Sequence, residues 1–199
     1  IQPPIIMKNM KVILKLLRPH QWAKNSFVFL PLFFNGKFTN LEFLFITIIV
    51  FFVFSFAASG IYCFNDILDA EKDKLHPIKR HRPIASGNIG KCSAFFIMLI
   101  CFIISLLTIY FFSSYIKTHV YNLYWVIAIY ILMNIFYCIK LKKMIIVDVF
   151  VIAIGFVLRI FAGGLATGIL LSHWLVLMTF LLALLLAFAK RRDDVVIYE

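Results

Sequence analysis

The chain has 199 residues, of which 63% are hydrophobic, and its mean hydropathy is +0.99. A soluble domain carries about 45–50% apolar residues, so this composition excludes an ordinary soluble domain and predicts an integral membrane protein. The net charge is +11, but the cations lie in short segments between apolar runs. That pattern is typical of membrane topology signals and argues against a nucleic-acid-binding face.

Six apolar stretches follow one another along the chain, and each is a candidate for a membrane span of about 20 residues. They lie at 27–34, 41–64, 93–112, 120–139, 145–169 and 172–189. Because a span must satisfy its own backbone hydrogen bonds, we predict an all-α, polytopic helical bundle with about six spans. Pro31 falls within the first stretch, so this span is expected to be short or kinked. Residues 1–24 form an amphipathic lead-in that lies on the membrane surface or begins the first span.

Lysine and arginine are distributed unevenly between the two sides of the predicted bundle. With the N-terminus in the cytoplasm, the cytoplasmic segments hold seventeen of them and the outer segments hold only Lys37 and Lys117. This bias predicts a multi-pass protein of the inner (cytoplasmic) membrane. The N-terminus, the polar segment 65–91 and any active site are then cytoplasmic, with 65–91 as a motif loop in one domain that covers 1–199.

The most unusual polar segment follows the 41–64 stretch and carries the motif Asn65-Asp66-x-x-Asp69-x-x-x-Asp73, which we call the acidic stripe. On a helix these spacings place all four side chains on one face. Mg²⁺ takes oxygen ligands and keeps positions open for substrate phosphates. We therefore predict a Mg²⁺ site with Asn65, Asp66, Asp69 and Asp73 as ligands and with the three aspartates as catalytic carboxylates. The alternative is a solvated loop between two helices.

A run of basic residues at 79–83 follows the acidic stripe. Beside a metal site, Lys79 and Arg82 are suited to hold phosphate oxygens, because ammonium and guanidinium groups are strong donors to phosphate. Tyr62 lies one turn before Asn65 and has a hydroxyl that could donate to the same ligand. The alternatives are a topology signal for the cations and an interfacial position for the tyrosine.

Asp148 and Arg159 lie within the fifth apolar stretch. Their separation is close to three helical turns, so both fall on nearly the same face, with Gly155 between them. Ionisable groups at membrane depth are costly and are usually functional. We expect Arg159 to face a polar cavity and bind an anionic ligand. Asp148 either orients Arg159 or a neighbouring lysine, or lies at the interface.

Two further cationic clusters lie at the ends of predicted spans. The first, at 137–143, contains Lys142 and is expected on the cytoplasmic side in any case. The second, at 190–194, begins with Lys190 and contains Asp193 and Asp194. It is either a second metal or phosphate site or a tail that stops transfer across the membrane.

The acidic stripe resembles the signature of the UbiA-type prenyltransferase superfamily, whose members are polytopic helical enzymes that use Mg²⁺ at a cytoplasmic cavity. Within that superfamily the chain looks most like the branch that uses 5-phosphoribosyl 1-diphosphate, the decaprenyl-phosphate phosphoribosyltransferases. The resemblance extends over 16–194 and is carried, besides the stripe, by the segments 18–25, 30–33, 76–87, 148–159 and 189–192.

The resemblance implies transfer of a phosphoribosyl group from phosphoribosyl diphosphate to a polyprenyl phosphate lipid, a step in the synthesis of cell-envelope precursors. It implies Asn65 and Asp69 as Mg²⁺ ligands, with Asp66 and Asp73 in support. The implied ligands of the donor phosphates are Lys24, Tyr62, Lys79, Lys142 and Arg159, while Lys190 meets the lipid phosphate. Homo-oligomerisation is left open.

Members of the superfamily usually have about nine spans of about 20 residues, and this chain has room for six. We expect a fragment, with a broken gene or a short variant that needs a partner as the alternatives. Two other functions compete with phosphoribosyl transfer. One is transfer of a prenyl chain from a prenyl diphosphate to an aromatic acceptor, and the other is a non-enzymatic membrane transport subunit.

Overall fold

Long apolar runs without proline form helices here, and polar turns separate them. The computed structural model describes residues 5–116 and 120–198, except for the side chains of 5–9, 143, 145 and 190–198. Within those residues the chain is helical and contains no strand. The elements are α1 Ile5–Leu17, η1 Pro19–Phe29, α2 Leu30–Phe34, α3 Leu41–Leu75, η2 Lys79–His81, α4 Lys91–Phe111, η3 Ser113–Tyr115, α5 Val120–Ile139, η4 Leu141–Lys143, α6 Ile145–Thr167 and α7 His173–Tyr198, where η denotes a 3₁₀ helix.

Helices α3, α4, α5 and α6 are each long and apolar enough to cross a membrane. The apolar part of α7, His173–Ala189, is shorter. The prediction of an all-α membrane bundle is therefore confirmed. The first expected span is not one α-helix, because the 3₁₀ helix η1 leads into the five-residue helix α2. Pro31 stands in the first turn of α2, where its missing N–H costs nothing, and the first expected span is not among the helices long enough to cross a membrane.

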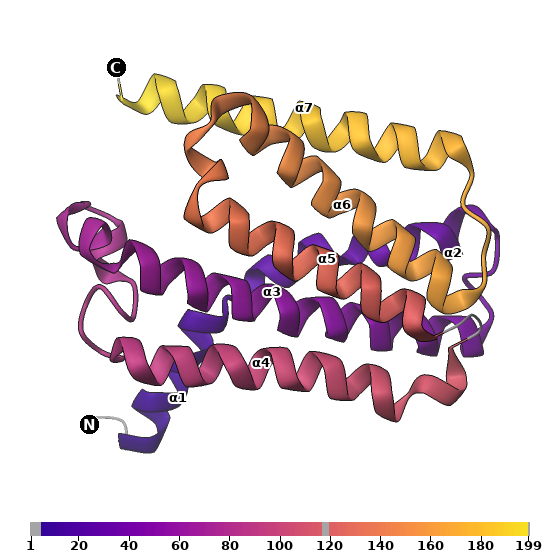
Figure 1. The fold of residues 1–199 in the computed structure, drawn as a ribbon, viewed down its shortest axis with the longest axis horizontal. Coiled ribbons are helices and arrows are strands. Elements are labelled where there is room, and N and C mark those ends of the chain that lie inside the picture. Colours follow the sequence, from indigo (N-terminus) through magenta and orange to yellow (C-terminus); the bar gives the residue numbers. More distant parts are fainter. Residues whose placement is uncertain (1–4, 117–119, 199) are drawn as a thin grey trace.

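Helix α3 is the central element of the bundle, with α4 antiparallel beside it and α5, α6 and η1 against its other sides (Figure 1). The core where these elements meet contains Phe54 of α3, Ile127 of α5 and Ala162 of α6. Small residues at the 57–60 positions of α3 are all buried. A Cβ atom on Gly60 would lie 2.5 Å from the ring of Phe102 on α4, so this contact depends on glycine.

The polar connections gather at one end of the bundle. Figure 1 places the α3–α4 connection, the turn between α5 and α6, helix α1 and the end of α7 at the same end. Helix α3 continues through the acidic stripe to Leu75, so the helical interpretation of 65–73 is confirmed. The side of the membrane on which this end lies remains a prediction from the charge bias.

Helix α6 packs closely against the N-terminal segment at Gly163. A Cβ atom there would lie 2.1 Å from the carbonyl oxygen of Val28, which is a backbone atom of η1 and cannot rotate away. We predict that Gly163→Ala lowers the free energy of unfolding by about 2 kcal/mol, the usual cost of overpacking. Thermal unfolding of the protein in detergent measures this.

The matched control is Gly90→Ala, because a Cβ atom at Gly90 meets nothing within 4 Å and its φ is negative. Equal melting temperatures for the two variants would contradict the packing argument.

Candidate functional site

The polar end of α3 carries the acidic stripe into a set of cations that come from three other segments. Asp66 and Asp73 are buried, at 1% and 4% exposed surface, whereas Asn65 and Asp69 are only partly buried. The stripe is therefore divided into two halves. Each half is neutralised by different cations.

The first half consists of Asn65 and Asp69, and it binds the side chain of Lys142. The ammonium Nζ of Lys142 donates to both carboxylate oxygens of Asp69 at 2.7 Å and to Oδ1 of Asn65 at 3.2 Å. Lys142 lies in the turn η4 between α5 and α6. Both members of the Lys142–Asp69 pair retain 21% of their side-chain exposure. A partly exposed ion pair of this kind contributes only about 1 kcal/mol.

The second half consists of Asp66 and Asp73, and it binds two arginines. Nη2 of Arg18 donates to Oδ1 of Asp66 at 2.6 Å. Nη1 of Arg82 bridges the two carboxylates, at 3.2 Å from Oδ1 of Asp66 and 2.8 Å from Oδ2 of Asp73. The remaining oxygen of Asp66, Oδ2, is buried and has no hydrogen-bond partner among the described residues. A buried carboxylate oxygen without a donor is costly, so this position is suited to a further cation or donor.

Arg18 is a site residue that the sequence analysis did not assign to the site, although it lies in the segment 18–25 that carries the family resemblance. Its backbone adopts the left-handed conformation, with φ 53° and ψ 58°, which is strained for a non-glycine residue. The guanidinium also lies 5.2 Å from the centre of the Tyr62 ring. Pro19 was the available signal, because the residue before a proline is disfavoured in a helix. Helix α1 therefore stops at Leu17, and Arg18 is free to turn toward Asp66.

Arg159 lies deeper in the bundle and is 6% exposed. Its guanidinium donates from Nε to Oδ1 of Asn25 at 2.8 Å, from Nη1 to the carbonyl of Gly155 at 2.6 Å and from Nη2 to the hydroxyl of Tyr130 at 3.1 Å. These three partners are neutral. Three aromatic rings also lie within cation–π distance of the guanidinium, namely Phe54, Tyr130 and Phe156. Arg159 is thus a buried positive charge held by dipoles and rings.

Among the described residues, Asp148 makes no hydrogen bond to Arg159, and orientation of a neighbouring lysine by Asp148 stays a prediction. The hydroxyl of Tyr137 on α5 donates to Oδ1 of Asp148 at 2.7 Å. Arg159 lies three turns further along α6 and is bound by Asn25, Gly155 and Tyr130. Asp148 therefore ties α6 to α5 near the polar end.

The remaining predicted site residues are not in the two halves of the stripe. Lys24 and Lys79 are exposed, on η1 and at the start of η2. Tyr62 is partly buried and is linked to the stripe through Arg18. The side chains of Lys190, Asp193 and Asp194 lie outside the described residues.

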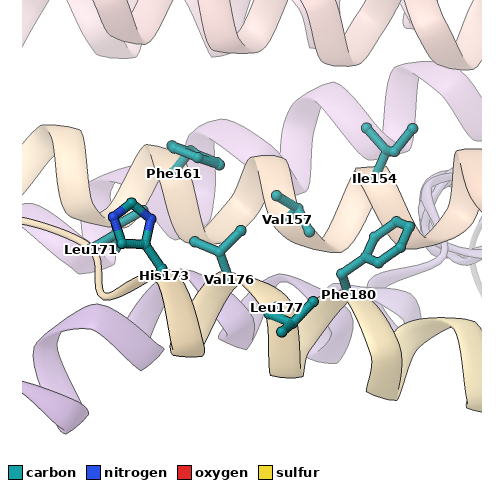
Figure 2. A pocket seen from close by; sticks show the side chains of 8 residues that line it. All are labelled: Ile154, Val157, Phe161, Leu171, His173, Val176, Leu177 and Phe180. Carbon is teal, nitrogen blue, oxygen red and sulfur yellow. The ribbon is translucent and has the colours of Figure 1, made fainter.

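An apolar cavity of about 420 Å³ lies between α6 and α7 (Figure 2). Ile154, Val157 and Phe161 line one wall, and Val176 and Phe180 are among the residues of the other. Among the described residues that line it, His173 is the one titratable group. No residue of the acidic stripe lines this cavity, so it is separate from the charged site.

The oxygen atoms of the first half are of the chemical types that bind a metal ion. Two carboxylate oxygens and one amide oxygen already converge on one cationic atom, Nζ of Lys142, and these are ligand types that Mg²⁺ takes. Among the described side chains, no three His, Cys, Asp or Glu groups form a cluster that could hold a metal. The four residues of the stripe therefore do not form one ready-made metal site.

These features define a class: a polytopic helical membrane protein with a cation-rich, carboxylate-bearing site at one end of its bundle. The sequence model described as the UbiA prenyltransferase family matches residues 26–196. The chain belongs to this family, as the motif predicted.

Relatives with assigned names match all or nearly all of the chain. Decaprenyl-phosphate phosphoribosyltransferase of Corynebacterium glutamicum is 37% identical over 203 residues, which are 100% of this chain and 58% of that protein. The enzyme of the same name from Mycobacterium tuberculosis is 34% identical over 191 residues, or 94% of this chain and 61% of that protein. The chain thus spans about three-fifths of the length of these relatives.

The fold has solved counterparts. A structure of a UbiA homologue from Archaeoglobus fulgidus, bound to DMAPP and Mg²⁺, superposes with a TM-score of 0.70 at 21% identity and covers 86% of this chain and 60% of that one. A digeranylgeranylglyceryl phosphate synthase structure gives the same TM-score at 23% identity and covers 92% and 61%. These likenesses support the helical membrane fold.

The bond between Asn25 and Arg159 provides a test of the deep network. Asn25 is fully buried, and its amide also donates to Ser55 on α3 at 3.0 Å. We predict that Asn25→Ala lowers the free energy of unfolding by about 2–3 kcal/mol, because it leaves a buried guanidinium N–H without its acceptor. The measurement is thermal unfolding in detergent.

Ser26→Ala is the matched control, because Ser26 is exposed and bonds only locally, to the carbonyl of Ala23 at 2.7 Å. If Asn25→Ala unfolds at the same temperature as Ser26→Ala, the network does not stabilise the bundle.

Proposed function

We propose that this chain carries the donor and metal site of a transferase that moves a 5-phosphoribosyl group from phosphoribosyl diphosphate to a polyprenyl phosphate. The observation that carries the proposal is that Asn65 and Asp69 already bind a cation, the ammonium of Lys142. Arg18 and Arg82 lie beside this site on the same stripe. The 34–37% identity to decaprenyl-phosphate phosphoribosyltransferases supports this choice of substrates.

The proposed reaction exchanges one bond at the anomeric carbon of the sugar. The bond from C1 to the diphosphate oxygen breaks, and the electron pair leaves with the diphosphate. A phosphate oxygen of the lipid then forms the new bond to C1. This oxygen is already anionic, so the site needs no strong general base. Catalysis then depends on positioning and on electrostatic stabilisation of the leaving group.

The residues of this chain divide these tasks. Asn65 and Asp69 hold Mg²⁺, with Asp66 and Asp73 in support, and the bound ion would supply positive charge to the departing diphosphate. Arg18 and Arg82 fix the carboxylates of Asp66 and Asp73. The remaining phosphates of the donor are assigned to the cations Lys24, Lys79, Lys142 and Arg159 together with the hydroxyl of Tyr62, and the lipid phosphate is assigned to Lys190.

The proposed location is the cytoplasmic membrane, with the charged end of the bundle in the cytoplasm. In the topology predicted from the sequence, the segments on that side hold seventeen of the twenty lysines and arginines. Residues 1–199 are proposed to act as one domain, with the 65–91 segment as its motif region. The full-length protein is the form in which activity is to be measured.

We predict that Asp69→Asn lowers Mg²⁺-dependent transfer by about 100-fold or more. The substitution removes an anionic ligand of the proposed Mg²⁺ ion, which stabilises the departing diphosphate. The yield of protein extracted from membranes and its melting temperature should stay near the wild-type values, because Asp69 is partly exposed. The assay follows labelled phosphoribosyl diphosphate into lipid.

The control is Glu71→Gln, on the same helix. Glu71 is exposed and pairs with Lys74 and Lys91, each at 2.9 Å, away from the stripe. Unchanged turnover in Asp69→Asn would remove the metal site from the proposal.

The same membranes separate the proposed substrates from the alternatives. Full-length protein receives labelled phosphoribosyl diphosphate with polyprenyl phosphate, or a labelled prenyl diphosphate with an aromatic acceptor. We predict label in lipid with the first pair only. Label transfer with the second pair alone would identify a prenyl-chain transferase, and none with either pair would favour a transport subunit.

A further inference from the structure

Lys142 occupies the place on the acidic stripe that the proposed function gives to a metal. Its ammonium is equidistant from the two oxygens of Asp69, at 2.7 Å, and reaches Asn65 at 3.2 Å. We infer that Lys142 is an exchangeable cation, which holds the Asn65 and Asp69 oxygens until a divalent metal with its diphosphate displaces it. This inference rests on the proposed function and adds an order of events to it.

A metal and the ammonium cannot share these three oxygens. Mg²⁺ binds oxygen at about 2.0–2.1 Å, so an ion held by Asn65 and Asp69 would overlap the volume that Nζ of Lys142 now fills. Two cations crowded onto one carboxylate also repel each other. Binding of the metal there therefore requires that Lys142 leaves.

The side chain of Lys142 can move away from the stripe, whereas Asn65 and Asp69 are held in place. The lysine lies in the short turn η4 on a flexible four-carbon stem and keeps 21% of its exposure. Asn65 and Asp69 are fixed on the rigid helix α3. The second half of the stripe differs, because Asp66 is 1% exposed and is bound by two arginines. Exchange is thus confined to the first half.

Charge decides which metal species displaces the lysine. With Lys142 bound, the ammonium and the carboxylate of Asp69 cancel. A bare divalent ion leaves an excess of two positive charges, because the released ammonium stays nearby. A metal that arrives with diphosphate brings its own negative charge, and the released ammonium can then donate to diphosphate oxygens. Metal and diphosphate should therefore bind together more tightly than separately, and Lys142 should account for that coupling.

Binding of Mn²⁺ to the full-length protein in detergent, followed by its electron paramagnetic resonance signal, tests the exchange. Lys142→Met is compared with wild type and with Lys140→Met, which removes an exposed lysine two residues away. Without diphosphate, we expect Lys142→Met to bind Mn²⁺ about tenfold more tightly than wild type. With inorganic diphosphate, Mn²⁺ affinity should rise about tenfold in wild type and less than about threefold in Lys142→Met. Lys140→Met should match wild type in both conditions.

Equal or weaker Mn²⁺ binding by Lys142→Met without diphosphate, or an undiminished effect of diphosphate in that variant, overturns the exchange. A second measurement needs no variant. Reductive methylation read by mass spectrometry should label Lys142 more rapidly, relative to Lys140, when wild type is saturated with Mg²⁺ in the absence of diphosphate, because the released ammonium then has no phosphate to bind. An unchanged or lower relative rate also overturns it.

The proposed function and the exchange can fail separately. If Lys142→Met binds Mn²⁺ more tightly but the wild type transfers no phosphoribosyl group, the exchange stands and the proposed substrates are wrong. If transfer occurs and Lys142→Met leaves Mn²⁺ binding unchanged, the function stands and the exchange is wrong.

Discussion

The constraint on which the site depends is the burial of carboxylates at the polar end of α3. Asp66 and Asp73 are almost fully removed from solvent, and an unpaired buried charge would destabilise the bundle strongly. Arg18 and Arg82 meet this need from the end of α1 and from the α3–α4 connection. The ion pairs therefore hold the end of α1 and the α3–α4 connection against α3. They also fix the orientation of the two carboxylates. Any ligand that enters must compete with these pairs or join them.

Arg159 is a second buried charge, and unlike the two aspartates it is surrounded by neutral groups. Arg159 is surrounded by an amide, a carbonyl, a hydroxyl and aromatic rings, so its positive charge is solvated but not neutralised by these partners. Asn25 joins it to η1, and Asn25 in turn bonds Ser55 on α3. The bundle thus has ion-paired clusters at its polar end and, beneath them, an arginine whose described hydrogen-bond partners are all neutral.

Sequence patterns predicted the parts of this structure that depend on local rules. Apolar length placed the long helices, and the spacing of Asn65 to Asp73 placed the stripe on one helix. What could not be predicted is which cation meets which carboxylate. Lys142 reaches Asp69 across 73 residues of sequence, and Arg159 reaches Asn25 across 134, so those pairings depend on how the helices pack. The same holds for Arg18, whose left-handed backbone follows from the junction between α1 and the 3₁₀ helix η1.

The length of α3 has a consequence for where chemistry takes place. Its 35 residues correspond to about 52 Å at 1.5 Å per residue, and the hydrocarbon core of a bilayer is about 30 Å thick. The helix therefore carries its polar end beyond the hydrocarbon as one rigid rod. From Asn65 to Asp73 it rises about 12 Å, which is more than the roughly 5–8 Å that each headgroup region adds to the hydrocarbon core. A single helix face thus extends from the hydrocarbon toward water, and the proposed sugar donor and the proposed lipid phosphate would reach the same row of side chains from opposite ends.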